Sequence, residues 1–173
     1  MVRLKYVFFH SLFFLFFSCN DKHENMKTYY PNGILKSEVI PVMDSLKQFT
    51  FLEFYPTGLL KSIQSLKNDT VFGQLLSFHE NGMLDKKIIV DSNGIASGMA
   101  YWFYTNGVLK SIRNYKNDKQ EGFGGDYWNK PFGFVKSAFI FNEDGQIVYK
   151  MNYDSIGTFI NSEGIKPKYW KGD

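Results

Sequence analysis

Short apolar runs alternate with turn-forming residues along most of this chain. The runs span roughly six residues and are rich in Phe, Tyr, Leu, Ile and Val, with Asn-Gly, Asn-Asp or a single Gly between them. Aromatic and β-branched residues favour strands, whereas Asn and Gly favour tight turns. After the N-terminal segment, no window keeps the three-and-four spacing of apolar residues that an amphipathic helix requires. The pattern therefore predicts an all-β chain of consecutive hairpins.

One block of residues recurs at nearly constant spacing. It consists of two aromatic residues, a variable residue, Asn or Thr, Gly, a variable residue, Leu, Lys and Ser, with small departures between copies. Four regular copies and a drifted fifth occupy residues 29–37, 54–62, 78–86, 103–111 and 141–147. Their glycines lie 25, 24, 25 and then 38 residues apart. A fixed period of this size indicates a repeat protein, in which each unit buries its apolar face only against its neighbours.

Each period has room for two strands and two turns. The Asn-Gly pairs predict type I′ hairpin turns, because that turn needs a positive φ at two successive residues. The longer last interval predicts an insertion of about 13 residues between Gly122 and Phe139, with the hairpin around Gly145 capping the array. The predicted fold class is an elongated, single-layer antiparallel meander of repeated β-hairpins.

Aligned positions of the copies predict which side chains share a face of the sheet. Successive residues of a strand point to opposite faces, so side chains two apart lie together. The predicted inward columns are Tyr29, Phe54, Phe78 and Phe103, then Leu52, Leu76 and Tyr101, and finally Leu35, Leu60, Leu84 and Leu109. Tyr55, His79 and Tyr104 are predicted to point the other way, and we interpret His79 as a substitution in this column rather than as a catalytic base.

The first residues form a separate segment. Arg3 and Lys5 precede an apolar stretch over 7–17 that is too short to cross a bilayer, which needs about 20 apolar residues, and that is typical of an export signal. We therefore predict a signal peptide at 1–18, a polar tether at 19–27, the repeat domain at 28–165 and a tail at 166–173.

The charge balance argues against nucleic acid as a partner. The formal net charge is +3, and without Arg3 and Lys5 the remaining 18 basic residues face 17 acidic ones. Chemistry that would hold a metal or cofactor has no motif here, because the chain has one cysteine, three scattered histidines and no phosphate-binding loop. We expect no cofactor and no metal.

Two resemblances extend these predictions. Ser18 directly before Cys19 resembles the lipobox of bacterial lipoproteins, with Phe16 where the usual lipobox has Leu. That resemblance implies lipidation of Cys19 and a location in the bacterial cell envelope. The recurring block resembles the MORN repeat variant of bacterial YwqK-family antitoxin proteins, over about residues 28 to 157. It implies a curved sheet of hairpins and a binding role.

Two features are candidates for recognition. The cations Lys36, Lys61 and Lys110 recur at hairpin spacing and could meet an acidic partner or anionic headgroups, or form a solvated face that discourages edge pairing. Aromatic residues of the supposed insertion could form a binding hot spot, or pack over the end of the sheet. They are Tyr127, Trp128, Phe132 and Phe134.

Three functions follow from these features. The first is a non-enzymatic, membrane-anchored lipoprotein that binds another protein or an envelope polymer. The second is an antitoxin or immunity protein that neutralises a toxin. The third is a glycan-active hydrolase that would use Glu53, Glu80 and Asp85 as its carboxylates.

Overall fold

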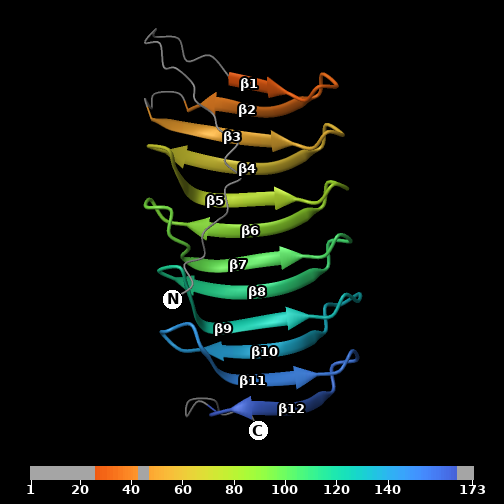
Figure 1. Ribbon diagram of the computed structural model, residues 1–173. Helices are drawn as coiled ribbons and strands as arrows, with labels where there is room; N and C mark the ends of the chain where they lie inside the picture. The colour runs from red at the N-terminus through yellow and green to blue at the C-terminus, as the bar shows by residue number, and fades with distance from the viewer. Residues whose placement is uncertain (1–25, 43–46, 167–173) are drawn as a thin grey trace.

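The chain folds into one antiparallel sheet of twelve strands, paired in the order of the sequence (Figure 1). The computed structural model describes residues 26–42 and 47–166. The strands are β1 (Met26–Tyr29), β2 (Leu35–Pro41), β3 (Gln48–Phe54), β4 (Leu60–Lys67), β5 (Thr70–Phe78), β6 (Leu84–Val90), β7 (Gly98–Phe103), β8 (Leu109–Lys116), β9 (Lys119–Tyr127), β10 (Val135–Phe141), β11 (Ile147–Tyr153) and β12 (Phe159–Gly164). This confirms the predicted all-β meander of hairpins.

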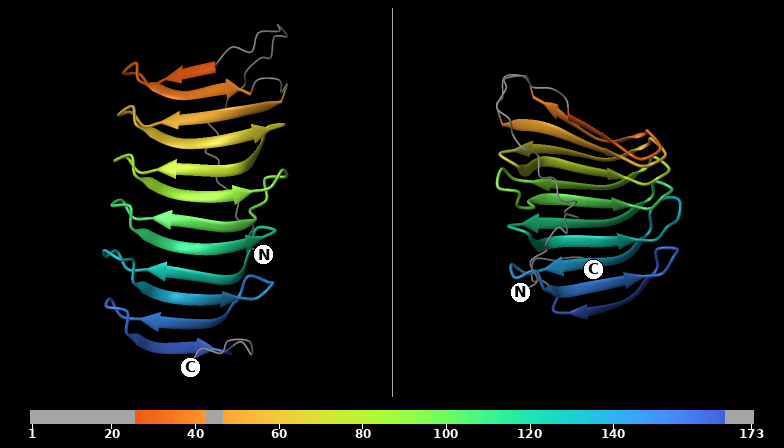
Figure 2. Two further views of the ribbon diagram at one scale, coloured as in Figure 1. Left: turned by 180° about the vertical axis from the view of Figure 1, so that it is seen from behind. Right: turned by 45° about the horizontal axis from the view of Figure 1, so that its top comes forward.

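The sheet forms a single layer whose strands bend along their length (Figure 2). β1 and β12 lie at opposite ends of the array, and every contact between elements joins strands that are adjacent in sequence. Loops that follow odd-numbered strands line one edge, which we call the block edge, and the others line the opposite edge (Figure 1). The described residues contain no helix long and apolar enough to span a membrane. The predicted signal peptide and Cys19 lie outside the described residues, and β1 begins inside the predicted tether.

The recurring block forms the loops of the block edge, but the predicted turn type is wrong. In the five-residue loops of this edge the glycine alone has a positive φ, for example +80° at Gly33 and +82° at Gly107. The backbone register shifts beside each loop, between Thr28 and Tyr29 in the first. One left-handed glycine with a bulge is the geometry of a type I turn followed by a G1 bulge. Two successive positive φ values occur on the opposite edge, at Asn117 and Asp118 and at the equivalent pair two periods earlier, Asn68 and Asp69. On the block edge they occur in the longer loop between β9 and β10, at Phe132 and Gly133.

The predicted insertion is also wrong. Residues 128–134 form a block-edge loop between β9 and β10, two residues longer than the others. In this loop Phe132 has φ +75° and Gly133 has φ +57°, and the next block-edge loop has Gly157 at φ +89°. The block-edge glycines thus continue at intervals of 26 and 24 residues after Gly107. The period runs without interruption through all twelve strands.

The supposed fifth copy around Gly145 lies on the opposite edge, between β10 and β11. It does not cap the array, because the last hairpin joins β11 to β12. An interval of 38 residues is close to one and a half periods, and half a period moves a loop from one edge to the other. The two kinds of loop share their backbone pattern: the Asn142 amide donates to the Gln146 carbonyl, as the Tyr104 amide donates to the Val108 carbonyl. Because both kinds of loop use the same local hydrogen bonds, a sequence that resembles the block also occurs on the opposite edge.

The apolar interior is small because neither face of the described sheet is covered by a second layer. One buried cluster consists of Ile88, Val90, Ala96 and Ala100, and another of Ala138, Ile140, Tyr149 and Met151. The predicted inward phenylalanines Phe54, Phe78 and Phe103 are only half-buried. The best buried of the described hydrophobic residues are two small ones, Ala100 at 1% and Ala96 at 2% exposure.

Candidate functional site

One cross-strand row of mostly polar residues runs the full length of the sheet on one face, which we call the row face. Each member is paired in register with the next, from β1 to β12. The members are Thr28, Ser37, Glu53, Ser62, Ser77, Lys86, Trp102, Ser111, Asp126, Ser137, Asn152 and Asn161. Hydrogen bonds join several neighbours, such as Ser62 Oγ to Glu53 Oε2 at 2.9 Å and Ser137 Oγ to Asn152 Oδ1 at 2.9 Å. Cross-strand pairs of this kind stabilise adjacent strands, so the row connects successive repeats.

A second series of contacts joins the repeats along the block edge. The second aromatic residue of each block reaches the backbone carbonyl that precedes the next block-edge loop. The Tyr30 hydroxyl donates to the Phe54 carbonyl at 2.7 Å, and the Tyr104 hydroxyl donates to the Tyr127 carbonyl at 3.0 Å. Equivalent side-chain contacts join Tyr55 to the Phe78 carbonyl, His79 to the Phe103 carbonyl and Trp128 to the Tyr153 carbonyl. His79 thus occupies a structural position of the tyrosines, as the sequence predicted.

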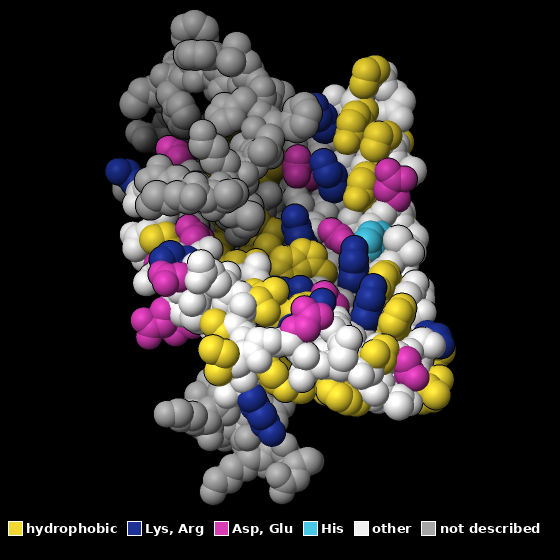
Figure 3. All heavy atoms as spheres, turned by 60° about the horizontal axis from the view of Figure 1, so that its bottom comes forward, with side chains coloured by type: hydrophobic (Ala, Val, Ile, Leu, Met, Phe, Trp, Pro, Cys, Tyr) yellow, Lys and Arg dark blue, Asp and Glu magenta, His cyan; other side chains and the backbone are white. Residues whose placement is uncertain are grey.

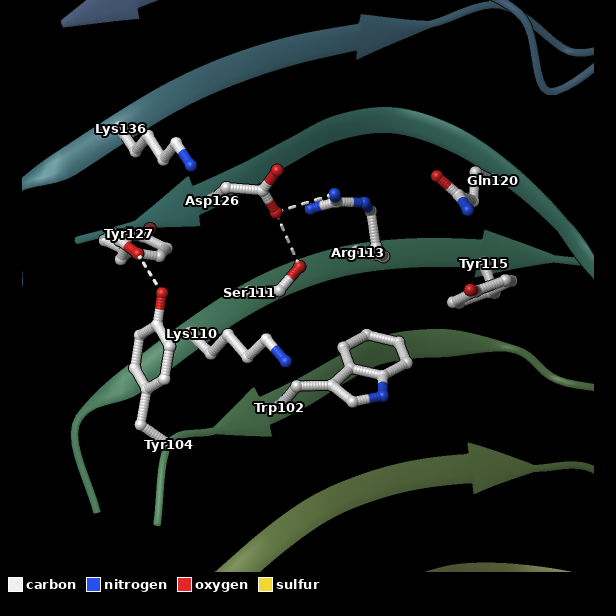
Figure 4. A pocket seen from close by; sticks show the side chains of 10 residues that line it. All are labelled: Trp102, Tyr104, Lys110, Ser111, Arg113, Tyr115, Gln120, Asp126, Tyr127 and Lys136. Atoms are coloured by element: carbon white, nitrogen blue, oxygen red, sulfur yellow. Dashed lines mark hydrogen bonds and ion pairs between the residues drawn. The ribbon is translucent and has the colours of Figure 1, made fainter. Parts of the chain in front are cut away.

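The row face carries an open depression of about 400 Å³ over β7 to β10 (Figure 4). Ten residues line it: Trp102, Tyr104, Lys110, Ser111, Arg113, Tyr115, Gln120, Asp126, Tyr127 and Lys136. Figure 3 looks onto a hollowed face, where basic and acidic side chains lie beside hydrophobic ones. A volume of this size falls in the range of about 300–1,000 Å³ typical of small-ligand sites.

Arg113 and Asp126 form the polar centre of this depression. Nη2 of Arg113 lies 2.7 Å from Oδ1 of Asp126, and Ser111 donates to the same oxygen at 2.9 Å. Nη1 of Arg113 donates to the carbonyls of Ile112 and Gly125. The guanidinium also stacks 4.9 Å from the centre of the ring of Phe139. Arg113 is therefore fully engaged by the protein, and its charge is balanced by Asp126.

A glycine on β9 makes room for the arginine. Gly124 is the register partner of Arg113. A Cβ atom at Gly124 would lie 2.9 Å from Cε2 of Phe141 and 3.1 Å from Cδ of Arg113. The aliphatic part of the Arg113 side chain therefore lies against β9 at Gly124, where any larger residue would displace the arginine.

We predict that Gly124→Ala lowers the free energy of unfolding by about 1–3 kcal/mol, because it overpacks this crossing. Gly125→Ala is the matched control, since the atoms nearest to its Cβ would be Cε2 and the hydroxyl oxygen of Tyr127 at 3.5 Å and the Ser137 carbonyl oxygen at 3.6 Å, which are ordinary contacts. We expect this control to be neutral, or to stabilise by up to about 1 kcal/mol through the unfolded chain. Urea unfolding of both variants makes the measurement, and an equal loss in both would contradict the packing described.

Two lysines flank the depression on equivalent strands. Lys110 on β8 and Lys136 on β10 each directly precede a serine of the row. Nζ of Lys110 lies 5.7 Å from the ring centre of Tyr104, and Nζ of Lys136 lies 4.8 Å from that of Trp128. Both side chains are exposed, and within residues 26–42 and 47–166 neither forms an ion pair with a carboxylate.

Burial keeps two phenols of the depression, those of Tyr115 and Tyr127, in the neutral form. Burial raises the pKa of Tyr127. Burial also raises the pKa of Tyr115, against the smaller opposing effects of a hydrogen bond to Gln120 and the charge of Arg113. Both phenols therefore remain available as hydrogen-bonding groups on the wall of the depression.

The carboxylates proposed for a hydrolase lie away from this depression. Glu53 accepts a hydrogen bond from Ser62, and Asp85 accepts one from Ser77 at 3.0 Å and lies 3.5 Å from Nε2 of His79. Burial raises the pKa of Tyr55, and Glu80, Asp85 and Glu53 raise it further. The negative charges of all three carboxylates thus act on the Tyr55 hydroxyl.

The predicted recognition residues divide between different environments. Lys110 and Tyr127 line the depression, whereas Lys36 and Lys61 recur on β2 and β4. Trp128 makes one of the contacts that join repeats along the block edge, by donating to the Tyr153 carbonyl, and is not part of an insertion. Phe132 is 96% exposed at the tip of its loop.

Comparisons with known proteins agree with the repeat geometry. Three segments, residues 25–40, 97–117 and 137–155, match the model of the MORN repeat variant. The chain contains MORN repeat variants. The first two matched MORN repeats cover the β1–β2 and β7–β8 hairpins, and the third covers β10 and β11 with the loop of the opposite edge between them.

The remaining comparisons add no function to these MORN repeats. No curated protein matches the chain. A crystal structure of a mutant of S. aureus TarM, in complex with fondaparinux, α-GlcNAc-glycerol and UDP, aligns with a TM-score of 0.40 at 10% identity. The alignment covers 60% of this chain and 20% of that chain.

Sequence reasoning missed Trp102, Arg113, Asp126 and Lys136 as parts of one site between MORN repeats. The sequence does contain a signal for the row. Each row residue on an odd-numbered strand from β1 to β11 directly precedes the first aromatic residue of a block. The sequence prediction does not identify Lys136, because it assigns this block to an insertion. With that block restored, Lys136 takes the position held by Lys110 one period earlier.

Proposed function

We propose that this protein is a non-enzymatic binding module, held in the bacterial cell envelope by a lipid on Cys19, which recognises another protein or an envelope polymer through its row face. The depression over β7 to β10 is the observation that carries the proposal. It combines aromatic surface, hydrogen-bonding groups and exposed cations on a rigid sheet, which is the composition of a recognition site.

The leader supports the location. A cationic start, a short apolar stretch and a small residue before the single cysteine are typical of an exported chain that is acylated. Two acyl chains are enough for stable attachment to a bilayer. The MORN repeats support the binding role, because a repeated sheet offers an extended surface to a partner.

Photocrosslinking in cells that produce the full-length chain tests this function. A photoreactive residue at Gln120, which lines the depression, is expected to capture a partner in the membrane fraction. The matched position is Phe123, which is on the same strand, is exposed, and points to the other face because it adjoins Gly124. Equal capture from both positions would contradict the proposal.

A second arm tests the anchor. We expect a labelled fatty acid to be incorporated into the wild-type chain and not into Cys19→Ala, which should leave the membrane fraction. Retention of Cys19→Ala in that fraction, with undiminished labelling, would exclude acylation of Cys19 while leaving the crosslinking result to decide the binding role.

A further inference from the structure

We propose that the depression binds an acidic saccharide, with carboxylates of the ligand at Lys110 and Lys136 and a sugar ring against Trp102. The inference rests on the proposed function and specifies the ligand class of that same site. It follows from the charge, the spacing and the chemistry of the lining residues.

The lining has an excess of positive charge that the described residues do not neutralise. Lys110, Arg113 and Lys136 face a single carboxylate, Asp126. Asp126 is already paired with Arg113 at 2.7 Å. The remaining charges are those of Lys110 and Lys136, which the structure places against aromatic rings instead of carboxylates. An anionic ligand would complement them, because charge-assisted hydrogen bonds are among the stronger polar contacts.

The two lysines are spaced for an extended ligand. Ser111, Asp126 and Ser137 are consecutive in the row, so the lysines preceding the two serines lie two strands apart. Two strands correspond to about 10 Å across an antiparallel sheet. A ligand with acidic groups on successive units along a chain could contact both lysines at once, whereas a single small anion could contact only one.

The surface beside the lysines offers groups that suit a sugar. Trp102 and Tyr104 on β7 and the following loop lie beside Lys110 (Figure 4). Aromatic rings offer an apolar face against which the C–H face of a sugar ring can stack. Gln120 and the neutral hydroxyl of Tyr115 add hydrogen-bonding groups that suit sugar hydroxyls.

The site lies within one face of the sheet rather than on a protruding tip. β7 to β10 have other strands on both sides, so the depression lies within the sheet and not at either end of the array. A flexible chain of sugars can enter such a depression. A flat bilayer surface would first meet the rim and the loops, so a lipid headgroup is the less suitable source of negative charge.

Calorimetric titration of the full-length protein in detergent tests the inference. The probe is an oligogalacturonate, with a neutral galactose oligomer of the same length for comparison. We expect the acidic oligomer to bind and the neutral one to bind at least about tenfold more weakly, since two charge-assisted contacts are lost. Binding of the acidic oligomer should weaken as salt is raised.

Paired lysine variants make the test specific. Lys110→Ala with Lys136→Ala should lower the affinity about tenfold or more, and Lys110→Arg with Lys136→Arg should restore most of it. Lys36→Ala with Lys61→Ala is the matched control, because it removes two exposed lysines at the equivalent positions of β2 and β4 and should leave the affinity unchanged. All four side chains are exposed, so none of these variants is expected to unfold the protein.

Four results would overturn the inference. The first three are equal binding of the two oligomers, no effect of the Lys110 and Lys136 variants, and binding to anionic phospholipid vesicles without binding to the oligogalacturonate. A protein partner captured from Gln120 in the absence of any saccharide binding would overturn it too, while leaving the proposed binding function in place.

Discussion

Ile88→Asp is expected to lower the free energy of unfolding by more than about 4 kcal/mol, enough to unfold much of the chain at ambient temperature. Ile88 is 6% exposed, and it forms a buried cluster with Val90, Ala96 and Ala100 on the row face. Leu75 and Trp102 pack against this cluster, and none of these side chains carries a charge that could pair with a carboxylate. A carboxylate at this position would have no partner within the cluster, and to pair with Lys86, two residues away on the same face, it would have to leave its buried position.

Ile89→Asp provides the matched control. Ile89 is the next residue on β6, points to the other face, and is 37% exposed. Its substitution should cost no more than about 1 kcal/mol, because the carboxylate can stay in water. Guanidinium unfolding followed by circular dichroism measures both variants. Similar losses at the two positions would mean that the row face does not contain the better buried cluster.

Much of this fold could be predicted from the sequence because the repeat is a local signal. The glycine of each block needs a left-handed backbone, so the period of the loops could be read directly from its recurrence. The alternating apolar runs between the glycines then left only hairpins between neighbouring strands. The strand order follows without further information, since each strand pairs with the next along the chain.

The fifth block could not be predicted in the same way. Two additional residues in the loop over 128–134 separate Trp128 from Gly133, so the block no longer aligned with the others. The loop around Gly145 offered a better local match because it uses the same backbone hydrogen bonds. The residues of a turn do not indicate on which edge of the sheet the turn lies. To assign the edge, the number of half-periods between turns has to be counted along the sequence.

The candidate site depended on register, which single residues do not reveal. The row combines Ser, Thr, Asn, Glu, Asp, Lys and Trp, so no residue type marks it. A bulge beside each block-edge loop shifts the pairing by one residue, as between Trp102 and Phe103. Ser111 therefore faces Trp102 and Asp126 instead of their neighbours, and the Arg113–Asp126 pair follows from that shift.

The second large effect is expected when a deletion of one full two-strand period is compared with a deletion of a single strand. Deleting residues 59–82 removes β4 and β5, which is one full period, and joins Gly58 to Met83. The block-edge loop is preserved, β3 now precedes β6, and the row continues from Glu53 to Lys86 on the same face. In a repeat protein each unit contacts only its neighbours, so the shortened array should still fold.

Deleting residues 59–69 removes only β4 and the following turn, and joins Gly58 to Thr70. β5 would then follow β3 directly, and every later strand would run in the reverse direction. To keep its native neighbours, the later part of the array would have to turn over, which carries its row residues to the other face. At the junction, the strand pairing that keeps the native register would then place side chains on the face opposite to the one on which they are buried.

Denaturant unfolding of these two deletions, followed by far-ultraviolet circular dichroism, tests most directly whether the sheet is one uninterrupted array with a period of two strands. We predict that the 24-residue deletion keeps a β-sheet spectrum and a cooperative transition, whereas the smaller 11-residue deletion loses the cooperative transition. A cooperative transition of equal midpoint in both deletions, or one found only in the smaller deletion, would contradict the two-strand period.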